Sequence, residues 1–226
     1  MQILSLSLIG GLLVLDTTAA LQILISQPLI ACTILGWFGG NVQLGLHFGL
    51  LIQLLWLSQL PVGAAKIPAG NLGSIAGVIL ALQLSPIFPE YEKMIILAAV
   101  ICALLFSYLG AILQAKINNW NTFFFNSVLK FLEQGRAGAL GVINVLALVF
   151  RFMLVAILLY GGVQVSFFLV KESFLVIPLE WDAYARYVEI AVVGAGIGSS
   201  LELYRGRKKM LTLLSGFSLG LLLFFF

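Results

Sequence analysis

The stretch between Asp16 and Lys66 contains no Asp, Glu, Lys or Arg. An apolar run of this length allows two membrane crossings, or one crossing plus segments that enter and leave on the same side. The composition agrees, because 62% of the residues are hydrophobic, 9% are charged and the mean hydropathy is +1.12, whereas soluble domains carry about 25% charged residues. The chain is therefore predicted to be an integral membrane protein.

The few ionisable residues argue against several functional classes. The net charge of +3 comes from twelve Lys and Arg scattered among apolar segments, without the basic stripe that binds nucleic acid. Cys32 and Cys102 lie far apart in apolar runs with no CxxC spacing, so neither a metal site nor a disulfide is expected. No nucleophile and base pair or Gly-rich phosphate loop occurs, and we expect no catalysis and no cofactor in this chain.

The apolar segments predict an all-helical chain of several crossings. At about 20 residues for each crossing, the length allows about five to eight passes. The amino-terminal segment lacks the positive region of a cleavable signal and is interpreted as retained. A turn is predicted at NVQLG, residues 41–45. A short apolar block ends at Pro86 and Pro89, and the polar residues 90–93 begin a span that closes at Lys116.

Later segments predict further spans near residues 141–170 and 187–204 and an apolar tail. Residues 116–140 mix aromatic and charged side chains, so an amphipathic helix is expected to lie there along the membrane interface, with Trp120 at headgroup level. Basic residues cluster in 116–140 and in 205–209, with two spans between them. Both segments are therefore predicted on the cytoplasmic side.

Residues 54–74 carry features that a plain membrane helix avoids. Pro61 and Pro68 cannot donate backbone hydrogen bonds, and an unsatisfied backbone group in lipid costs several kcal/mol. Small residues such as Gly63 and Ala64 permit close backbone approach. This pattern is typical of the broken or re-entrant elements that form binding sites in transporters. An ordinary exterior loop between two spans is the alternative.

Three amides, Gln53, Gln59 and Asn71, lie in this weakly polar region. A neutral polyol such as a sugar suits them, because an amide offers a donor and an acceptor without a charge to desolvate. The alternative for any one amide is a hydrogen bond between helices, worth about 0.6 to 2 kcal/mol in membranes. For His47 that interhelical role is the favoured interpretation. Gln53 and His47 are six residues apart, so on one helix they would face different ways.

Arg151 lies inside a predicted span, where an arginine costs at least about 2.5 kcal/mol unless it is paired or hydrated. The candidate partners are four acids, Asp16, Glu133, Glu189 and Glu202. A structural ion pair and a contact with substrate both remain open. Asp16 and Arg151 are accordingly candidates for a buried charge or a gating role.

Three stretches carry a resemblance to a known family: residues 15–75 with SQPLIAC and LPVGAAxxP, residues 131–152, and the Gly-rich residues 192–204. Together they resemble the IIC subunit of mannose-type (mannose, fructose, sorbose) permeases of the bacterial phosphotransferase system, or PTS. The resemblance implies one IIC-type transmembrane domain over residues 1–226. Residues 1–84 would then form the re-entrant, pocket-forming part, and residues 90–226 the spanning helices with the amphipathic stretch.

The resemblance also implies partners. IIC subunits pair with a membrane subunit, IID, as a trimer of heterodimers in the bacterial inner membrane. Soluble IIA and IIB proteins relay phosphate from phosphoenolpyruvate, so the phosphorylating residues are expected on IIB and this chain is expected to be a transporter subunit rather than an enzyme.

The sequence therefore predicts a permease subunit that binds a hexose or amino sugar through Gln53, Gln59, Asn71 and backbone groups near Gly63, Ala64 and Pro68, assisted by Lys66 or Arg151. The alternative is a regulatory or scaffold paralogue that docks IID or PTS proteins without transport. It arises because family members often carry acids where this chain has Gln53, Gln59 and Ala69. An ion-coupled carrier is a weaker third reading, because Asp16 is the only buried acid expected in the first half.

Overall fold

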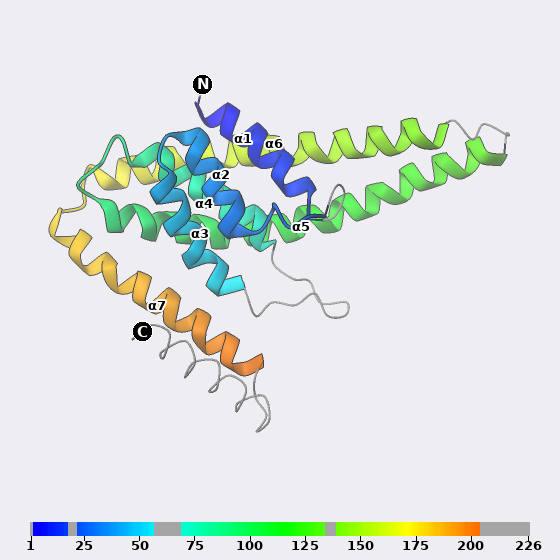
Figure 1. Ribbon diagram of the computed structural model, residues 1–226. Coiled ribbons are helices and arrows are strands. Elements are labelled where there is room, and N and C mark those ends of the chain that lie inside the picture. Colours follow the sequence, from blue (N-terminus) through cyan, green and yellow to red (C-terminus); the bar gives the residue numbers. More distant parts are fainter. Residues whose placement is uncertain (1, 18–21, 57–68, 134–138, 204–226) are drawn as a thin grey trace.

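The computed structural model describes residues 2–17, 22–56, 69–133 and 139–203, and in these ranges the chain is helical without a strand (Figure 1). The helices are α1 (Gln2–Leu15), α2 (Pro28–Gly39), α3 (Val42–Trp56), α4 (Gly70–Leu84), α5 (Glu92–Glu133), α6 (Ala139–Phe174) and α7 (Glu180–Leu203). The predicted all-helical class is confirmed. The re-entrant element expected around residues 57–68 lies outside the described residues and stays a prediction.

Helix length separates two classes of element. Within α5 and α6, the segments Glu92–Trp120 and Gly141–Phe174 have 29 and 34 residues and are apolar enough to cross a membrane. At 1.5 Å per residue both exceed the roughly 30 Å hydrocarbon core. The apolar helices α1 to α4 have only 12 to 15 residues. Each is therefore too short to cross alone.

The described ranges contain fewer candidate membrane spans than the five to eight passes that the length allows. Two helices in the described ranges, rather than five to eight, are long and apolar enough to span. The span expected at residues 187–204 overlaps α7, which is helical but falls outside that set. Helix α7 carries charged residues along its length, with Glu180, Asp182, Arg186 and Glu189 in its first half and Glu202 near its end.

Helices α2 and α3 form a hairpin whose turn is at Gly40 and Asn41. Gly40 adopts φ 84°, a left-handed conformation that glycine tolerates, and closes α2. The Asn41 side chain then accepts a hydrogen bond from the Leu44 N–H at 3.0 Å and caps α3. The turn predicted for residues 41–45 is thus wrong beyond Asn41, because Val42 to Gly45 already form the first turn of α3.

Helix α4 lies at the centre of the core. Twelve of its 15 residues are buried, and it packs against α5 so closely that a Cβ on Gly73 would lie 2.2 Å from the carbonyl oxygen of Ala103. The helix ends at Leu84, directly before the predicted stop at Pro86. Sequence and structure agree on this boundary because proline restricts the residue before it and cannot continue the helix.

Helices α5 and α6 extend from the core as a long hairpin (Figure 1). As predicted, α5 starts within the polar residues 90–93, at Glu92, and the Asp182 carboxylate accepts a hydrogen bond from the Met94 N–H at 2.8 Å. Residues 116–133 continue α5 without a break instead of forming a separate amphipathic helix. Trp120 packs edge-on against Phe150 of α6, with 5.2 Å between ring centroids. The interfacial location of this stretch stays a prediction.

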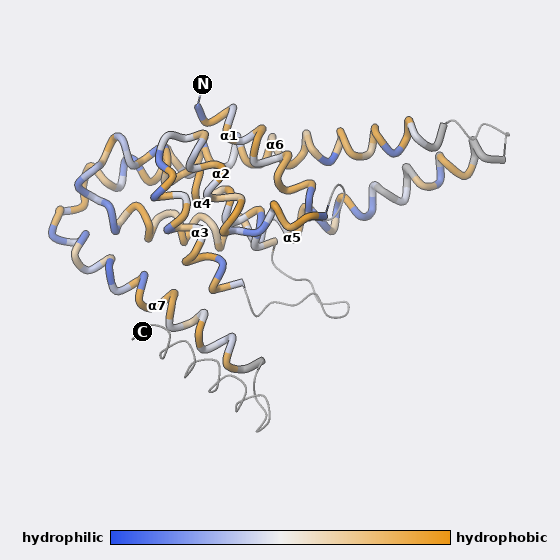
Figure 2. The backbone as a smooth tube through the Cα atoms, in the orientation of Figure 1, coloured by the Kyte–Doolittle hydropathy of each residue, from blue (hydrophilic) through white to orange (hydrophobic). Residues whose placement is uncertain are grey.

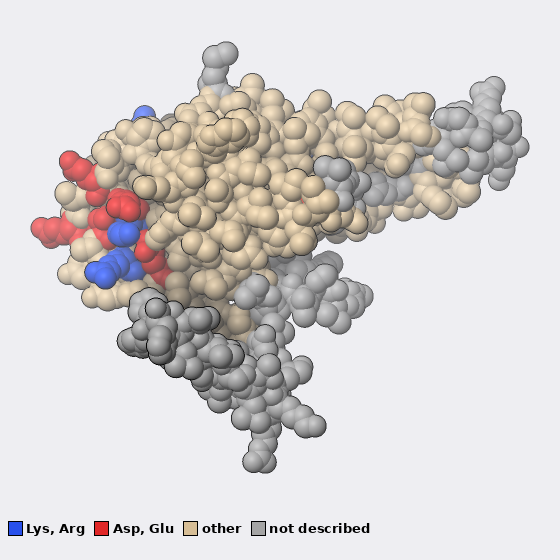
Figure 3. Space-filling view, viewed as in Figure 1, with Lys and Arg blue, Asp and Glu red and all other residues tan. Residues whose placement is uncertain are grey.

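Polarity is distributed unevenly over the molecule. Figure 2 shows mostly hydrophobic residues along α6 and around the core. Figure 3 shows acidic and basic side chains gathered at one end, where α5 begins and α7 begins. On the face shown, the charged side chains of the described residues thus gather at this end, whereas most of the buried polar side chains in the described ranges are neutral serines.

Candidate functional site

Polar side chains from three separate parts of the chain converge on residues 26–29, the connection into α2. They are Asp16 after α1, Gln53 on α3 and Asn71 on α4. Two of the predicted sugar-binding amides, Gln53 and Asn71, therefore contact the same short segment. Each contact has a distinct chemical role.

Asp16 organises the connection between α1 and α2. Its side chain is buried, and its two carboxylate oxygens accept hydrogen bonds from the N–H groups of Ile23 at 2.8 Å and Ser26 at 3.2 Å. Burial alone would raise the pKa of Asp16, but hydrogen bonds from the backbone of Ile23, Ser26 and Ile25 and from the Ser26 side chain lower it below its ordinary value. The carboxylate is therefore stabilised in its charged form.

The same connection holds an unusual backbone. Gln22 and Leu24 have φ values of 53° and 69°, in a left-handed region that bulky residues rarely adopt. Such conformations persist where surrounding contacts enforce them, and they cluster at ligand sites. Ile23, which bonds Asp16, lies between these two residues. Asp16 thus fixes a strained loop beside α2.

Gln53 joins α3 to the start of α2. Its Oε1 accepts a hydrogen bond from the Leu29 N–H at 3.3 Å, and its Nε2 donates to Oε1 of Gln27 at 3.2 Å. Leu29 is in the first turn of α2, where backbone N–H groups have no partner inside the helix. Gln53 therefore satisfies a helix-end donor that carries part of the positive end of the helix dipole.

Asn71 secures the start of α4 to the same loop. Its Nδ2 donates to the hydroxyls of Thr17 and Ser26, both at 3.2 Å. The Ala69 N–H donates to the carbonyl of Ser107 on α5 at 2.9 Å. The amino terminus of α4 is therefore held on two sides.

Arg151 has a different environment from the one expected. It is buried, and its guanidinium donates to Oε1 of Gln114 on α5. Its Nε has no hydrogen-bond partner among the described residues. Of its candidate acidic partners, Asp16 binds backbone amides and Glu189 faces Lys93. The side chains of Glu133 and Glu202 are outside the described set. The partner that the structure gives Arg151 is a neutral amide.

The other predicted site residues, Gln59, Gly63, Ala64, Lys66 and Pro68, lie outside the described residues. Three residues outside the predicted site, Thr17, Ser26 and Gln27, hydrogen-bond the predicted amides. A signal for two of them was present, because Pro28 is at the first position of α2, where proline is common, and places Ser26 and Gln27 at the helix entrance.

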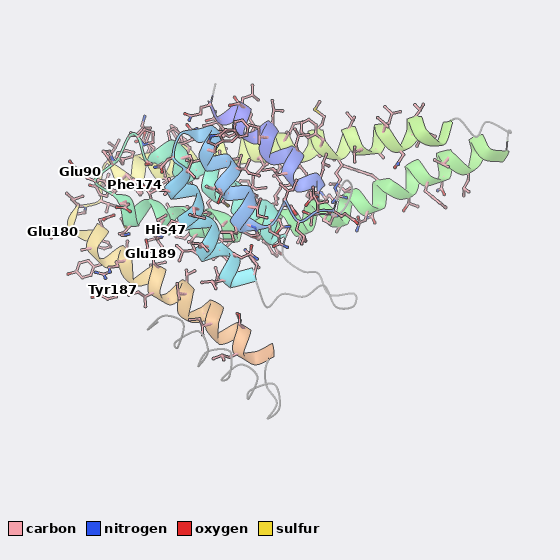
Figure 4. All side chains as sticks on the ribbon, viewed as in Figure 1. His47, Glu90, Phe174, Glu180, Tyr187 and Glu189 are labelled. Atoms are coloured by element: carbon pink, nitrogen blue, oxygen red, sulfur yellow. The ribbon has the colours of Figure 1, made fainter. Side chains whose placement is uncertain are left out.

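His47 faces a neighbouring helix, at a distance longer than the interhelical hydrogen bond favoured for it. Its Nε2 lies 3.7 Å from Oε1 of Glu189 on α7, and Lys93 Nζ lies 3.4 Å from the same oxygen. Figure 4 shows His47 and Glu189 near one another at the α3 and α7 pair. As predicted, His47 faces away from Gln53, which turns toward α2.

The chemistry available around residues 26–29 is hydrogen bonding. The groups are amides, hydroxyls, backbone N–H groups and one stabilised carboxylate. In the described ranges, no three His, Cys, Asp or Glu side chains lie together as metal ligands would. The arrangement suits a neutral ligand with many hydroxyl groups.

Comparison with known proteins gives the family. The family model described as "PTS system sorbose-specific iic component" matches residues 1–222. This chain belongs to that family. IIC components of this system are transporter subunits rather than the enzymes that transfer the phosphoryl group. The resemblance seen in the sequence is confirmed.

A curated relative, the PTS system sorbose-specific EIIC component of Klebsiella pneumoniae, is 39% identical over 56 residues. That match spans 25% of this chain and 21% of the length of the relative. A solved structure described as a membrane protein has a TM-score of 0.75 at 22% identity and covers 96% of this chain and 85% of its own. The mannose transporter ManYZ in complex with microcin E492 (MceA) has a TM-score of 0.58 at 20% identity, covering 96% and 83%. Both structures support the fold.

Proposed function

We propose that this IIC subunit binds a hexose or amino sugar and moves it inward during phosphoenolpyruvate-dependent transport, with phosphorylation by a IIB partner. The observation that carries the proposal is the convergence of Asp16, Gln53 and Asn71 on residues 26–29. These groups come from three elements, so a ligand bound there would touch several parts of the core at once. That is an arrangement by which a ligand can stabilise one conformation of a transporter.

The amides retain hydrogen-bonding capacity for a sugar. Among the described contacts, Asn71 uses its Nδ2 donors, which leaves its side-chain carbonyl as an acceptor for a hydroxyl. Gln53 Nε2 makes one described bond and has a second N–H. Both side chains are half-buried, so their bonds to a ligand would be partly shielded from water.

Residues outside the described ranges complete the proposed site. Gln59 adds a third amide, and Gly63, Ala64 and Pro68 supply backbone groups of a re-entrant element. Lys66 or Arg151 assists by bonding the sugar or by stabilising phosphate near the inner mouth. The burial of Arg151 beside a neutral Gln114 is consistent with a cation kept for such a contact.

The working assembly contains a IID-like membrane subunit and soluble IIA and IIB proteins, with a trimer of heterodimers in the bacterial inner membrane. Family membership supports these partners, since a IIC component is one part of a multi-component system. The multi-pass location is supported by the spanning segments Glu92–Trp120 and Gly141–Phe174.

A non-transporting regulatory or scaffold subunit is the second candidate. One observation favours it: Gln53 is already bonded to Leu29 and Gln27, so its amide has a structural role without any sugar. The two functions differ in whether Gln53 contacts a transported ligand.

Uptake measurements separate them. Cells lacking their own permeases would receive this chain with its neighbouring subunits and a panel of labelled hexoses and amino sugars. We expect phosphoenolpyruvate-dependent uptake of one sugar that disappears with Gln53→Ala and persists with Gln43→Ala, an exposed glutamine on the same helix. Absence of uptake by the folded complex would favour the scaffold.

A further inference from the structure

Helix α7 contacts the main chain of α3 at Gly196. A Cβ placed on Gly196 would lie 2.8 Å from Cβ of Leu54 and 2.9 Å from its carbonyl carbon and oxygen. Because these include backbone atoms, no side-chain rotation relieves the overlap. Glycine is therefore required for the two helices to approach this closely.

A second contact lies two helical turns away. Oε1 of Glu189 on α7 lies 3.7 Å from Nε2 of His47 on α3 (Figure 4). The same oxygen lies 3.4 Å from Nζ of Lys93 on α5. Both contacts advance by seven residues on each helix, from His47 to Leu54 and from Glu189 to Gly196. The helices therefore run side by side in the same direction for about 10 Å.

The Gly196 contact is adjacent to the proposed site. Leu54 follows Gln53, whose side chain holds the Leu29 N–H and Gln27. We propose that α7 is a positioning element, in which Gly196 sets the place of the α3 backbone at Leu54 and thereby aligns Gln53 with the start of α2. Its effect on sugar binding rests on the proposed function, but the alignment itself does not.

The first half of α7 is held against α5, so that strain from a side chain added at Gly196 acts on α3. Asp182 accepts a hydrogen bond from the Met94 N–H of α5 at 2.8 Å, and Glu189 lies 3.4 Å from Lys93. Since these contacts hold α7 to α5, an added methyl at Gly196 displaces the end of α3. That end carries Gln53.

Neighbouring glycines supply matched controls. A Cβ on Gly194 or Gly198 would meet no atom within 4 Å, and both positions are exposed, whereas Gly196 is buried. The same substitution by alanine therefore tests contact with α3 at one position and only helix propensity at the other two. Alanine favours a helix interior over glycine, so Gly194→Ala and Gly198→Ala should not loosen α7.

The hydrogen-exchange rate of the Leu29 amide reports whether Gln53 is aligned with the start of α2, and the measurement needs no sugar. In the full chain within its membrane complex, Gly196→Ala should speed exchange at Leu29 about tenfold, since one hydrogen bond guards that amide. Gly194→Ala and Gly198→Ala should exchange as the unaltered chain does. Unchanged protection in Gly196→Ala, or equal loss in all three variants, would overturn the proposal.

A second variant covers the case in which Gly196→Ala does not fold. Glu189→Gln weakens the other α7 contact without adding atoms, and it should speed Leu29 exchange by a smaller factor, about twofold to threefold. No change at Leu29 would again contradict the positioning role.

Sugar binding gives the remaining readout. Where the unaltered complex binds a sugar, Gly196→Ala should raise the Kd of that sugar about tenfold while the complex stays folded, and the two control variants should not. Binding that is equal in all variants contradicts coupling of α7 to the site. An unaltered complex that binds no sugar contradicts the proposed function alone, because the exchange result stands by itself.

Discussion

Helix α4 buries most of its residues inside the protein, whereas the α5–α6 hairpin leaves more of its apolar residues exposed. Twelve of the 15 residues of α4 are buried by other parts of the protein. By contrast, 22% of an apolar stretch of 18 residues within Gly141–Phe174 on α6 is buried inside the protein. The corresponding share within Glu92–Trp120 on α5 is 50%. A short helix is thus held by close tertiary packing, whereas a long one presents an apolar surface that suits lipid.

Polar contacts follow the same division. Around α2 to α4, neutral amides and hydroxyls bond loops and helix ends. On the long hairpin, the buried cation Arg151 is joined to Gln114. Specific hydrogen bonds therefore build the proposed site, and the long helices depend mainly on length and apolarity.

Added side-chain volume should destabilise the protein more at α4 than on the long hairpin. We expect Gly73→Ala to destabilise the protein by about 3 kcal/mol, the upper part of the range for overpacking, because its Cβ would overlap Ala103 and Ser107 of α5. Gly161→Ala is the matched control, since its Cβ would meet no atom within 4 Å. Thermal unfolding in detergent measures both. Similar melting temperatures would show that α4 is not tightly packed.

The contribution of the buried Arg151 to the stability of the α5–α6 hairpin can be measured. Gln114→Leu should cost about 1.5 to 3 kcal/mol, because Arg151 then loses its hydrogen-bond acceptor. Adding Arg151→Met should recover most of that loss by removing the unpaired charge. Chemical unfolding of the single and double variants measures the difference, and an equally unstable double variant would contradict this account.

A smaller effect is expected at the start of α4. Asn71→Ala removes the two hydrogen bonds to Thr17 and Ser26 and should cost about 1 kcal/mol in stability. Gln43→Ala, on an exposed site of α3, should cost nothing measurable. Melting temperatures of the two variants compare them directly. Equal values would show that Asn71 does not stabilise the start of α4.

Acid should weaken the loop that Asp16 holds. The pKa of Asp16 is lowered from its ordinary value of 3.8, so its contribution to stability is present above that value and is lost as the pH falls through the lower folded pKa. The melting temperature of the unaltered chain should exceed that of Asp16→Asn at pH 7, and the difference should shrink below about pH 4. A constant difference would contradict the linkage.

Much of the helical organisation could be predicted from local signals. The stop of α4 before Pro86 and the start of α5 at Glu92 follow from proline geometry and from a change in polarity. Gln53 and Asn71 stand out because amides are rare in an apolar run. Their meeting at residues 26–29 is a tertiary fact that no spacing in the sequence gives.

Other features depend on packing across the chain. Asn41 is a helix cap rather than the start of a longer turn, because α3 begins as soon as α2 has closed. The partner of Arg151 is Gln114 rather than an acid, and only the pairing of α5 with α6 selects it. The Gly-rich segment of α7 shows one close contact, at Gly196, beside two exposed glycines.

Equilibrium sugar binding by the purified membrane complex shows whether a sugar site exists at the start of α2. We expect saturable binding of one hexose or amino sugar by the unaltered complex and by Gln43→Ala, and its loss in Gln53→Ala while the complex stays folded. Binding by Gln53→Ala equal to that of the unaltered complex, or no sugar binding by a folded complex, would contradict a sugar site at the start of α2.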